Sequence, residues 1–258
     1  MSSIRSSAID AVVIEADPPL LSERRGKALL VTLNRPKVRN ALNGTALEAL
    51  ERVLTDARQD QSLGVVVLRG AGGYFCAGGD LKERATLAID GDGEGTLQGR
   101  NRREGALIRA IDELPQIVVS AVEGGAVGGG VGIVCVSDVV IAAVSAMFST
   151  PEVLTGAVPA QIAPHVIRRL GWSHGRRLLL SGGKCDGAEA HRIGLVHEVV
   201  PAGASFDAAL GKLIDQLSRC DALAVRAAKE LLSKLKSEPP GYSETAAALY
   251  AAIRRQQP

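Results

Sequence analysis

Apolar runs of strand length alternate with segments of helical spacing over the first half of the chain. A helix is expected to start near Asn43, because Leu47, Leu50 and Leu54 follow at the spacing of one helix face. A second helix is expected from Gln98 to Glu113. The strand-like runs are Ala28 to Leu33, Val65 to Leu68, Ile117 to Val122 and Val139 to Val144. This alternation predicts an α/β core with parallel strands.

Both ends of the chain depart from that alternation. The β-branched run Ala11 to Ala16 precedes a turn signal at Glu23 to Gly26, so these residues and the strand after them predict a hairpin. After Pro201 the spacing is helical throughout. Helices are expected at Phe206 to Leu217, Ala222 to Leu235 and Ser243 to Arg254. We therefore expect a core over residues 1–200 and a helical region over residues 201–258.

Composition narrows the class of protein. Apolar residues make up 46% of the 258 residues but aromatics only 3%, so the core is built from aliphatic side chains. The net charge of +2 gives no reason to expect binding to nucleic acid or a membrane surface. Four widely spaced cysteines without a CxxC pair predict neither a metal site nor a disulfide framework. With no signal peptide and no apolar run long enough to span a bilayer, a cytoplasmic protein is expected.

Two glycine-rich turns, Cys76 to Asp80 and Gly124 to Gly130, each follow an apolar run. Neither has the spacing of a dinucleotide-binding or phosphate-binding loop. A strand that feeds glycines into a helix start presents unpaired N–H groups and the positive end of the helix dipole. The alternative is that glycine only permits close packing of helix on sheet. Two such turns in one chain favour an oxyanion-binding function.

A single carboxylate, Glu152, follows the second turn among apolar neighbours. Pro151 suits the first position of a helix and Thr150 suits its N-cap, so one interpretation is that Glu152 complements a helix dipole. The other is that an apolar setting raises the pKa of Glu152 for general acid–base catalysis. Asp80 is expected to cap the helix after it. The four histidines show no metal-ligand spacing, and no G-x-S-x-G nucleophile motif is present.

Together these segments resemble the crotonase (enoyl-CoA hydratase/isomerase) superfamily over nearly the whole chain. Each segment is weak alone, but their order is specific. They are Leu33 to Leu42, Phe75 to Lys82, Gly124 to Gly132, Phe148 to Gly156 and Leu180 to Val196.

The resemblance implies a spiral of ββα turns with C-terminal helices that support a homotrimer or a dimer of trimers. It implies an acyl-CoA thioester as substrate, with no separate cofactor because coenzyme A is part of the substrate. The backbone N–H groups that polarise the thioester carbonyl match Gly79 and Gly129, and the acid/base matches Glu152. For coenzyme A the resemblance points to Val38, Asn40, Ala41, Ala77 and Lys82. Lys82 is equally well explained as an exposed helix lysine.

One position departs from the two-glutamate members of the family. Their first glutamate falls at Gly132, which has no side chain to ionise. The run from Gly128 to Gly132, with Pro159 to Pro164, resembles a one-glutamate branch that includes methylglutaconyl-CoA-type hydratases. Those enzymes act on branched or carboxylated enoyl groups, and Gly132 is expected to leave room for such a group.

Four functions follow as hypotheses. The first is a lyase that hydrates a 2-enoyl-CoA, with Gly79 and Gly129 as the oxyanion hole and Glu152 as acid/base. The second is an enoyl-CoA isomerase that uses Glu152 alone. A decarboxylase is the third, and an acyl-CoA-binding protein without turnover is the alternative that is not an enzyme.

Overall fold

A computed structural model describes residues 18–89, 93, 95–233, 243–244, 247–248 and 251. Its larger sheet has six strands in the order β1-β2-β3-β4-β6-β9. Only the β1–β2 pair is antiparallel; the other four pairs are parallel. The strands are β1 (Leu20–Arg25), β2 (Ala28–Leu33), β3 (Val65–Gly70), β4 (Ile117–Val122), β6 (Val139–Ala143) and β9 (Glu198–Val200).

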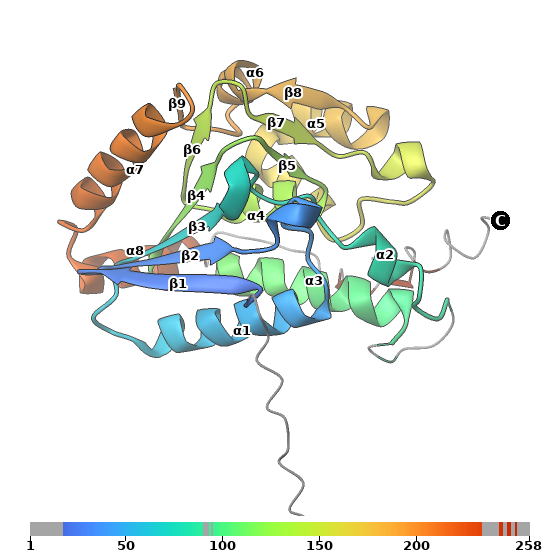
Figure 1. The fold of residues 1–258 in the computed structure, drawn as a ribbon, viewed down its shortest axis with the longest axis horizontal. Helices are drawn as coiled ribbons and strands as arrows, with labels where there is room; N and C mark the ends of the chain where they lie inside the picture. Colours follow the sequence, from blue (N-terminus) through green and yellow to red (C-terminus); the bar gives the residue numbers. More distant parts are fainter. Residues whose placement is uncertain are drawn as a thin grey trace, which may run out of the picture.

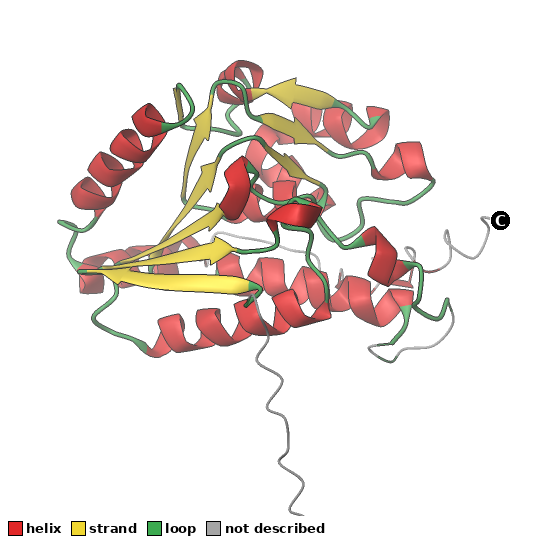
Figure 2. Cartoon of the chain, in the orientation of Figure 1, coloured by secondary structure: helices red, strands yellow, loops and turns green. Residues whose placement is uncertain are grey.

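A second sheet of three short strands lies beside the first (Figures 1 and 2). Its middle strand, β7, pairs parallel with β5 and antiparallel with β8. These strands are β5 (Gly125–Val127), β7 (Met147–Ser149) and β8 (Lys184–Asp186). Helices follow the pairs of successive strands β1–β2, β4–β5 and β6–β7, and this order agrees with a spiral of ββα turns.

Helices connect and cover the sheets. The α-helices are α1 (Gly44–Gln59), α2 (Leu81–Arg84), α3 (Leu97–Asp112), α4 (Gly129–Val136), α5 (Ala163–Ser181), α6 (Gly187–Arg192), α7 (Ala204–Leu217) and α8 (Ala222–Ser233). The 3₁₀ turns of the described residues are η1 (Pro36–Val38), η2 (Ala71–Gly73) and η3 (Glu152–Thr155). Within the described residues, only helices follow β9, as expected, while the proposed division at residue 200 stays a prediction.

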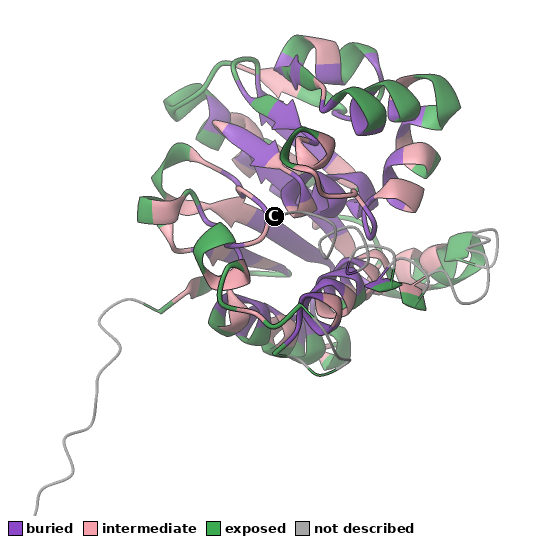
Figure 3. Ribbon diagram, turned by 90° about the vertical axis from the view of Figure 1, so that its right-hand side faces the viewer, coloured by how far each residue is buried: buried purple, intermediate pink, exposed green. Residues whose placement is uncertain are grey.

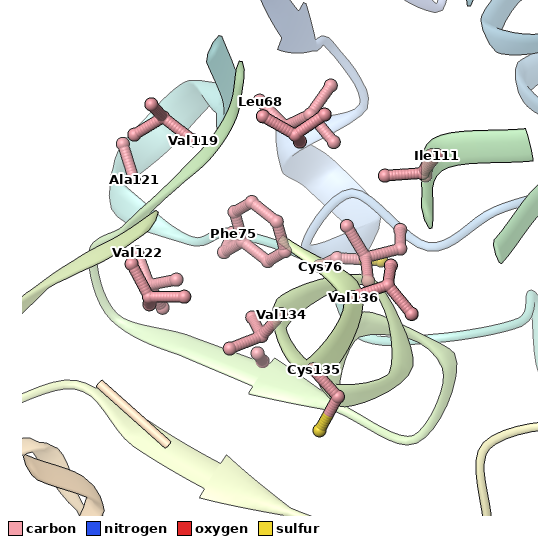
Figure 4. Close-up of a cluster of buried hydrophobic side chains, with 14 of the residues drawn as sticks. Leu68, Phe75, Cys76, Ile111, Val119, Ala121, Val122, Val134, Cys135 and Val136 are labelled. Atoms are coloured by element: carbon pink, nitrogen blue, oxygen red, sulfur yellow. The ribbon is translucent and has the colours of Figure 1, made fainter. Parts of the chain in front are cut away.

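The core centres on α4, which is apolar on every side and buried from Gly130 to Val136. This helix packs between α3 and α5. Figure 4 shows Val134, Cys135 and Val136 of α4 in the same apolar cluster as Phe75 and Cys76. Buried residues follow most of the strands, whereas the outer helices carry exposed faces (Figure 3). A Cβ on Gly130 of α4 would lie 2.6 Å from the Cys76 carbonyl oxygen, so the start of the first glycine turn packs directly against α4.

The predicted hairpin is present, but its first strand was misplaced. Residues 11–16 lie outside the described residues, and β1 instead includes Glu23 and Arg25, which were expected to form the turn. The turn is at Gly26, whose φ of 58° lies in the left-handed region. Every residue of β1 after Leu20 is exposed, and most of them are polar. Their polar composition is the reason why the sequence pattern indicated a turn here.

Candidate active site

Strand pairing brings the two glycine turns together. Cys76 bridges Ala126 in parallel, and the Val127 N–H donates to the Cys76 carbonyl at 2.9 Å. Gly79 and Gly129 each lie three residues beyond this bridge. At the same level a Cβ on Gly78 would lie 3.4 Å from the Gly129 nitrogen. The turns are therefore neighbours, as an oxyanion site requires.

The N–H groups of Gly79 and Gly129 remain available for a ligand. Gly129 is the first residue of α4, where an N–H has no partner within its own helix. In the described part of the chain, neither N–H donates to a backbone carbonyl of another element. Glycine at 79 is not needed for a left-handed φ; it leaves space for the Arg84 guanidinium, which a Cβ there would overlap.

A cavity of about 150 Å³ opens beside these turns. Aliphatic side chains and glycine backbone form much of its wall, and a few polar groups face it. The lining residues include Ala77, Gly78, Gly79, Leu81, Arg84, Asn101, Glu104, Ile108, Val127, Gly128, Gly129, Glu152, Val158, Gln161 and Ile162. Such a mixture fits a substrate with an apolar chain and one reacting polar group.

Parallel pairing of β5 with β7 places Glu152 beside the second glycine turn. Val127 pairs with Ser149, so Gly129 and Glu152 follow closely after the carboxyl ends of neighbouring strands. A Cβ on Gly128 would lie 2.9 Å from Glu152 Oε1. Glycine at 128 thus lets the carboxyl approach the second turn.

The helix start expected before Glu152 is wrong in detail. Pro151 is itself the N-cap of η3, and no side chain caps that turn. Thr150 instead donates its hydroxyl to the Leu178 carbonyl at 2.7 Å, which ties the end of β7 to α5. Because η3 has only four residues, a helix dipole gives little reason for the acid at 152. Glu152 lines the cavity, which is where the acid–base interpretation would need it.

The surroundings of the Glu152 carboxyl raise its pKa, as proton transfer by a carboxyl requires. Burial raises its pKa above the ordinary value, and the nearby charge of Glu104 raises it further, while its own N–H and Arg84 act in the opposite direction. Oε2 is buried and has no hydrogen-bond partner among the described residues. A raised pKa brings a carboxyl nearer to the pH at which it both takes and gives a proton.

Comparison with known proteins decides the family. The family described as Enoyl-CoA hydratase/isomerase matches residues 23–254. The chain belongs to this family. Enoyl-CoA hydratase EchA19 of Mycobacterium tuberculosis is 36% identical over 215 residues, covering 83% of this chain and 80% of that protein. The 2,3-dehydroadipyl-CoA hydratase of Escherichia coli is 35% identical over 214 residues, covering 83% and 81%.

Solved structures agree. Pseudomonas aeruginosa AtuE has a TM-score of 0.80 and 41% identity, covering 93% of this chain and 92% of that chain. An enoyl-CoA hydratase/isomerase from Marinobacter aquaeolei has a TM-score of 0.80 and 36% identity over the same shares. The crotonase-like α/β fold predicted from the sequence is confirmed, and the protein is an enzyme of the hydratase/isomerase family.

Gly132 does not provide the open space that was expected for this family member. A Cβ there would lie 2.7 Å from Ile162 Cγ2 and 2.8 Å from Ile108 Cδ1. Both isoleucines line the cavity, whereas Gly132 does not. These aliphatic side chains fill the space beside Gly132, so the expectation of room there is wrong.

Residues expected to bind coenzyme A fall into two groups. Ala77 lines the cavity, and its N–H donates to the Arg39 carbonyl at 2.9 Å, so the loop that holds Asn40 and Ala41 runs beside it. The Asn40 amide is occupied with its own loop, because it donates to the Ala71 and Tyr74 carbonyls at 2.9 and 2.6 Å. Asn40 therefore shapes the loop through its side chain.

Val38 and Lys82 lie away from the cavity. Val38 lines a separate surface hollow with residues 34–37. Lys82 is exposed on α2 and does not line the cavity. Binding of coenzyme A by these residues remains a prediction.

Sequence patterns missed two charged residues of the site, Arg84 and Glu104. Arg84 Nη2 lies 2.5 Å from Glu104 Oε2, and both side chains line the cavity. The signal was present in α3, where Asn101, Glu104 and Ile108 recur at helical spacing and all face the cavity. Polar residues on a buried helix face identify a site more strongly than composition does.

The described residues contain neither a metal-binding cluster nor a membrane-spanning helix. They contain no group of three or more His, Cys, Asp or Glu side chains placed to hold a metal ion. Within the same residues, every helix is too short or too polar to cross a bilayer. Cys76, Cys135 and Cys185 are buried free thiols whose pKa values burial raises to about 12, 12 and 11, so they stay protonated.

Proposed function

We propose that the protein hydrates a 2-enoyl-CoA thioester. The N–H groups of Gly79 and Gly129 bind the thioester oxygen, and Glu152 is the acid/base. A buried carboxyl with a raised pKa, placed against the Gly128–Gly129 turn, carries this proposal. The relatives named as hydratases support it.

The proposed reaction is an addition in two proton movements. Glu152 takes a proton from water while the water oxygen bonds to C3. The C2=C3 electron pair then moves onto the thioester as an enolate, whose oxygen accepts hydrogen bonds from Gly79 and Gly129. Glu152 returns the proton to C2, so one water is added and no group leaves. Each donor to the oxyanion contributes about 3–4 kcal/mol to the transition state, as in other oxyanion holes.

Isomerisation is the second function that a specific observation favours. Position 132 carries no carboxyl, and aliphatic side chains fill the space beside it, so the family's first glutamate has no counterpart at this position. A single acid at 152 is sufficient to carry a proton from C2 or C4 to the other carbon. In that reaction the oxyanion hole has the same function, but no water is used.

The test is a panel of 2-enoyl-, 3-enoyl- and carboxylated enoyl-CoAs, with products followed by mass spectrometry. Gain of one water by a 2-enoyl-CoA supports hydration. An unchanged mass with a moved double bond establishes the isomerase instead, and loss of CO₂ establishes a decarboxylase. Either of the last two without any hydration overturns the proposal.

We also propose that backbone of Val38, Asn40, Ala41 and Ala77 holds the coenzyme A part, and that the chain forms a homotrimer or a dimer of trimers. Exposed leucines on α8 support assembly, since Leu223, Leu231 and Leu232 are 76%, 63% and 56% exposed. Light scattering in solution should give three or six chain masses. A monomer would contradict the proposed assembly but would leave the proposed hydration reaction unaffected.

A further inference from the structure

The cavity contains a second carboxylate that the proposed reaction has not yet used. Glu104 is only 9% exposed and lies on the face of α3 that lines the cavity. It lies on a different helix from position 132, where the first glutamate of two-glutamate members falls. The charge of Glu104 acts on Glu152. The two acids therefore share one site.

Two arginines fix the Glu104 carboxylate. Arg84 Nη2 lies 2.5 Å from Oε2, and Arg100 Nε lies 3.3 Å from Oε1. Arg100 is itself anchored, because its Nη2 donates to the Leu42 carbonyl at 2.7 Å. Each guanidinium group donates to one oxygen of Glu104, so both oxygens of this carboxylate are held in place.

A carboxylate has about four acceptor positions, and the two arginines account for two of them. The remaining lone pairs are available to the cavity that Glu104 lines. The other acid, Glu152, has a buried oxygen without a partner among the described residues. In the proposed reaction Glu152 moves the proton, while Glu104, held by two arginines, is placed to orient the water.

We infer that Glu104 is the second acid of this site, a catalytic residue that accepts a hydrogen bond from the attacking water while Glu152 takes the water's other proton. The inference rests on the proposed hydration. Glu104 exchanges no proton or electron pair, so the balance of the reaction is unchanged. Arg84 and Arg100 are positioning residues that hold the Glu104 carboxylate.

The test compares Glu104→Gln with Glu83→Gln. Glu83 is a matched control because its Oε2 lies 3.0 Å from Arg100, yet Glu83 does not line the cavity. Glu104→Gln is expected to lower the kcat of hydration by about a hundredfold or more while KM changes less than about threefold. Glu83→Gln is expected to keep both constants within about threefold of the wild-type values.

A second measurement separates water binding from collapse of the site. Exchange of the C2 proton of a saturated acyl-CoA in D₂O needs the oxyanion hole and Glu152, but no attacking water. Glu104→Gln should keep this exchange within about fivefold of the wild-type rate, whereas Glu152→Gln should lose it. If Glu104→Gln does not fold, Glu104→Asp keeps the charge but withdraws it from the water, and at least a tenfold loss of hydration is expected.

Three results would overturn the inference. Hydration by Glu104→Gln within about fivefold of wild type removes Glu104 from the chemistry. An equal loss of hydration in Glu104→Gln and Glu83→Gln would show that Glu104 forms a structural ion pair only. A parallel loss of hydration and C2 proton exchange in Glu104→Gln would show the same. A wild-type protein that hydrates no 2-enoyl-CoA overturns the proposed function first, and the inference with it.

Discussion

At the scale of single residues, Glu152 links catalysis to stability. Burial raises its pKa in the folded protein above the ordinary 4.5. The folded state therefore holds this proton more tightly than the unfolded chain does. The stability that the group contributes is complete below the ordinary pKa and is lost as pH rises through the folded-state value. A carboxyl suited to proton transfer thus lowers the free energy of unfolding at neutral pH.

Glu152→Gln should consequently gain stability relative to wild type as pH rises. The amide cannot ionise, so the variant does not lose the stability that wild type loses when Glu152 gives up its proton. Urea unfolding at about pH 4 and about pH 8 should show the difference, variant minus wild type, increasing by about 1 kcal/mol or more between the two. The same difference at both pH values would mean that the pKa of Glu152 is not raised.

Gly132 gives a second prediction at this scale. Gly132→Glu should lower the free energy of unfolding by about 3 kcal/mol or more, because it places a charge against Ile108 and Ile162. Gly132→Ala is the control and should cost about 1–3 kcal/mol from overpacking alone. Denaturant unfolding measures both. A Gly132→Glu variant as stable as wild type would show that the isoleucines move aside and open the space.

At the scale of elements, α2 connects the first glycine turn to the charged pair. Asp80 begins the helix, as the sequence predicted, by accepting from the Lys82 and Glu83 N–H groups at 3.1 and 3.4 Å. Its other oxygen pairs with Arg35 at 2.9 Å. Desolvation alone would raise the pKa of Asp80, but Arg35 and the helix N–H groups outweigh it and the pKa is lowered. The cap thereby fixes the short helix from which Arg84 reaches Glu104.

Two substitutions separate the cap from the charge. Asp80→Asn keeps a good N-cap but removes the ion pair, whereas Asp80→Ala removes both. We expect Asp80→Ala to be less stable than Asp80→Asn by about 1 kcal/mol in denaturant unfolding at neutral pH. Equal stability of the two variants would mean that the cap contributes nothing and that Arg35 alone holds Asp80.

The sequence predicted the elements that are long enough for their apolar residues to form a recognisable pattern. Strand β4 and helix α3 lie within a residue of their expected bounds, because β4 is buried along nearly its whole length and α3 has buried apolar residues at helical spacing. By contrast, β5, β7 and β8 have three residues each, too few for any period to appear. Their positions follow from pairing with one another, which only the folded chain shows.

At the scale of the whole molecule, the site joins segments that are far apart in sequence. The stretch that contains Gly79, Gly129 and Glu152 could be identified because glycine turns and an isolated acid are visible locally. The pairing of Arg84 with Glu104 could not, since it depends on how α2 and α3 pack. The closed space beside Gly132 depends likewise on Ile162, which lies thirty residues later.

The proposed function depends on Glu152 as the proton carrier and on the N–H groups of Gly79 and Gly129 as the oxyanion hole. The kcat for hydration of a 2-enoyl-CoA, compared between wild type and Glu152→Gln, tests it most directly. We predict a loss of at least about a hundredfold in the variant, the lower end for general acid–base catalysis. Near-normal turnover by Glu152→Gln would contradict the account, because no group in the described cavity would then carry the assigned proton.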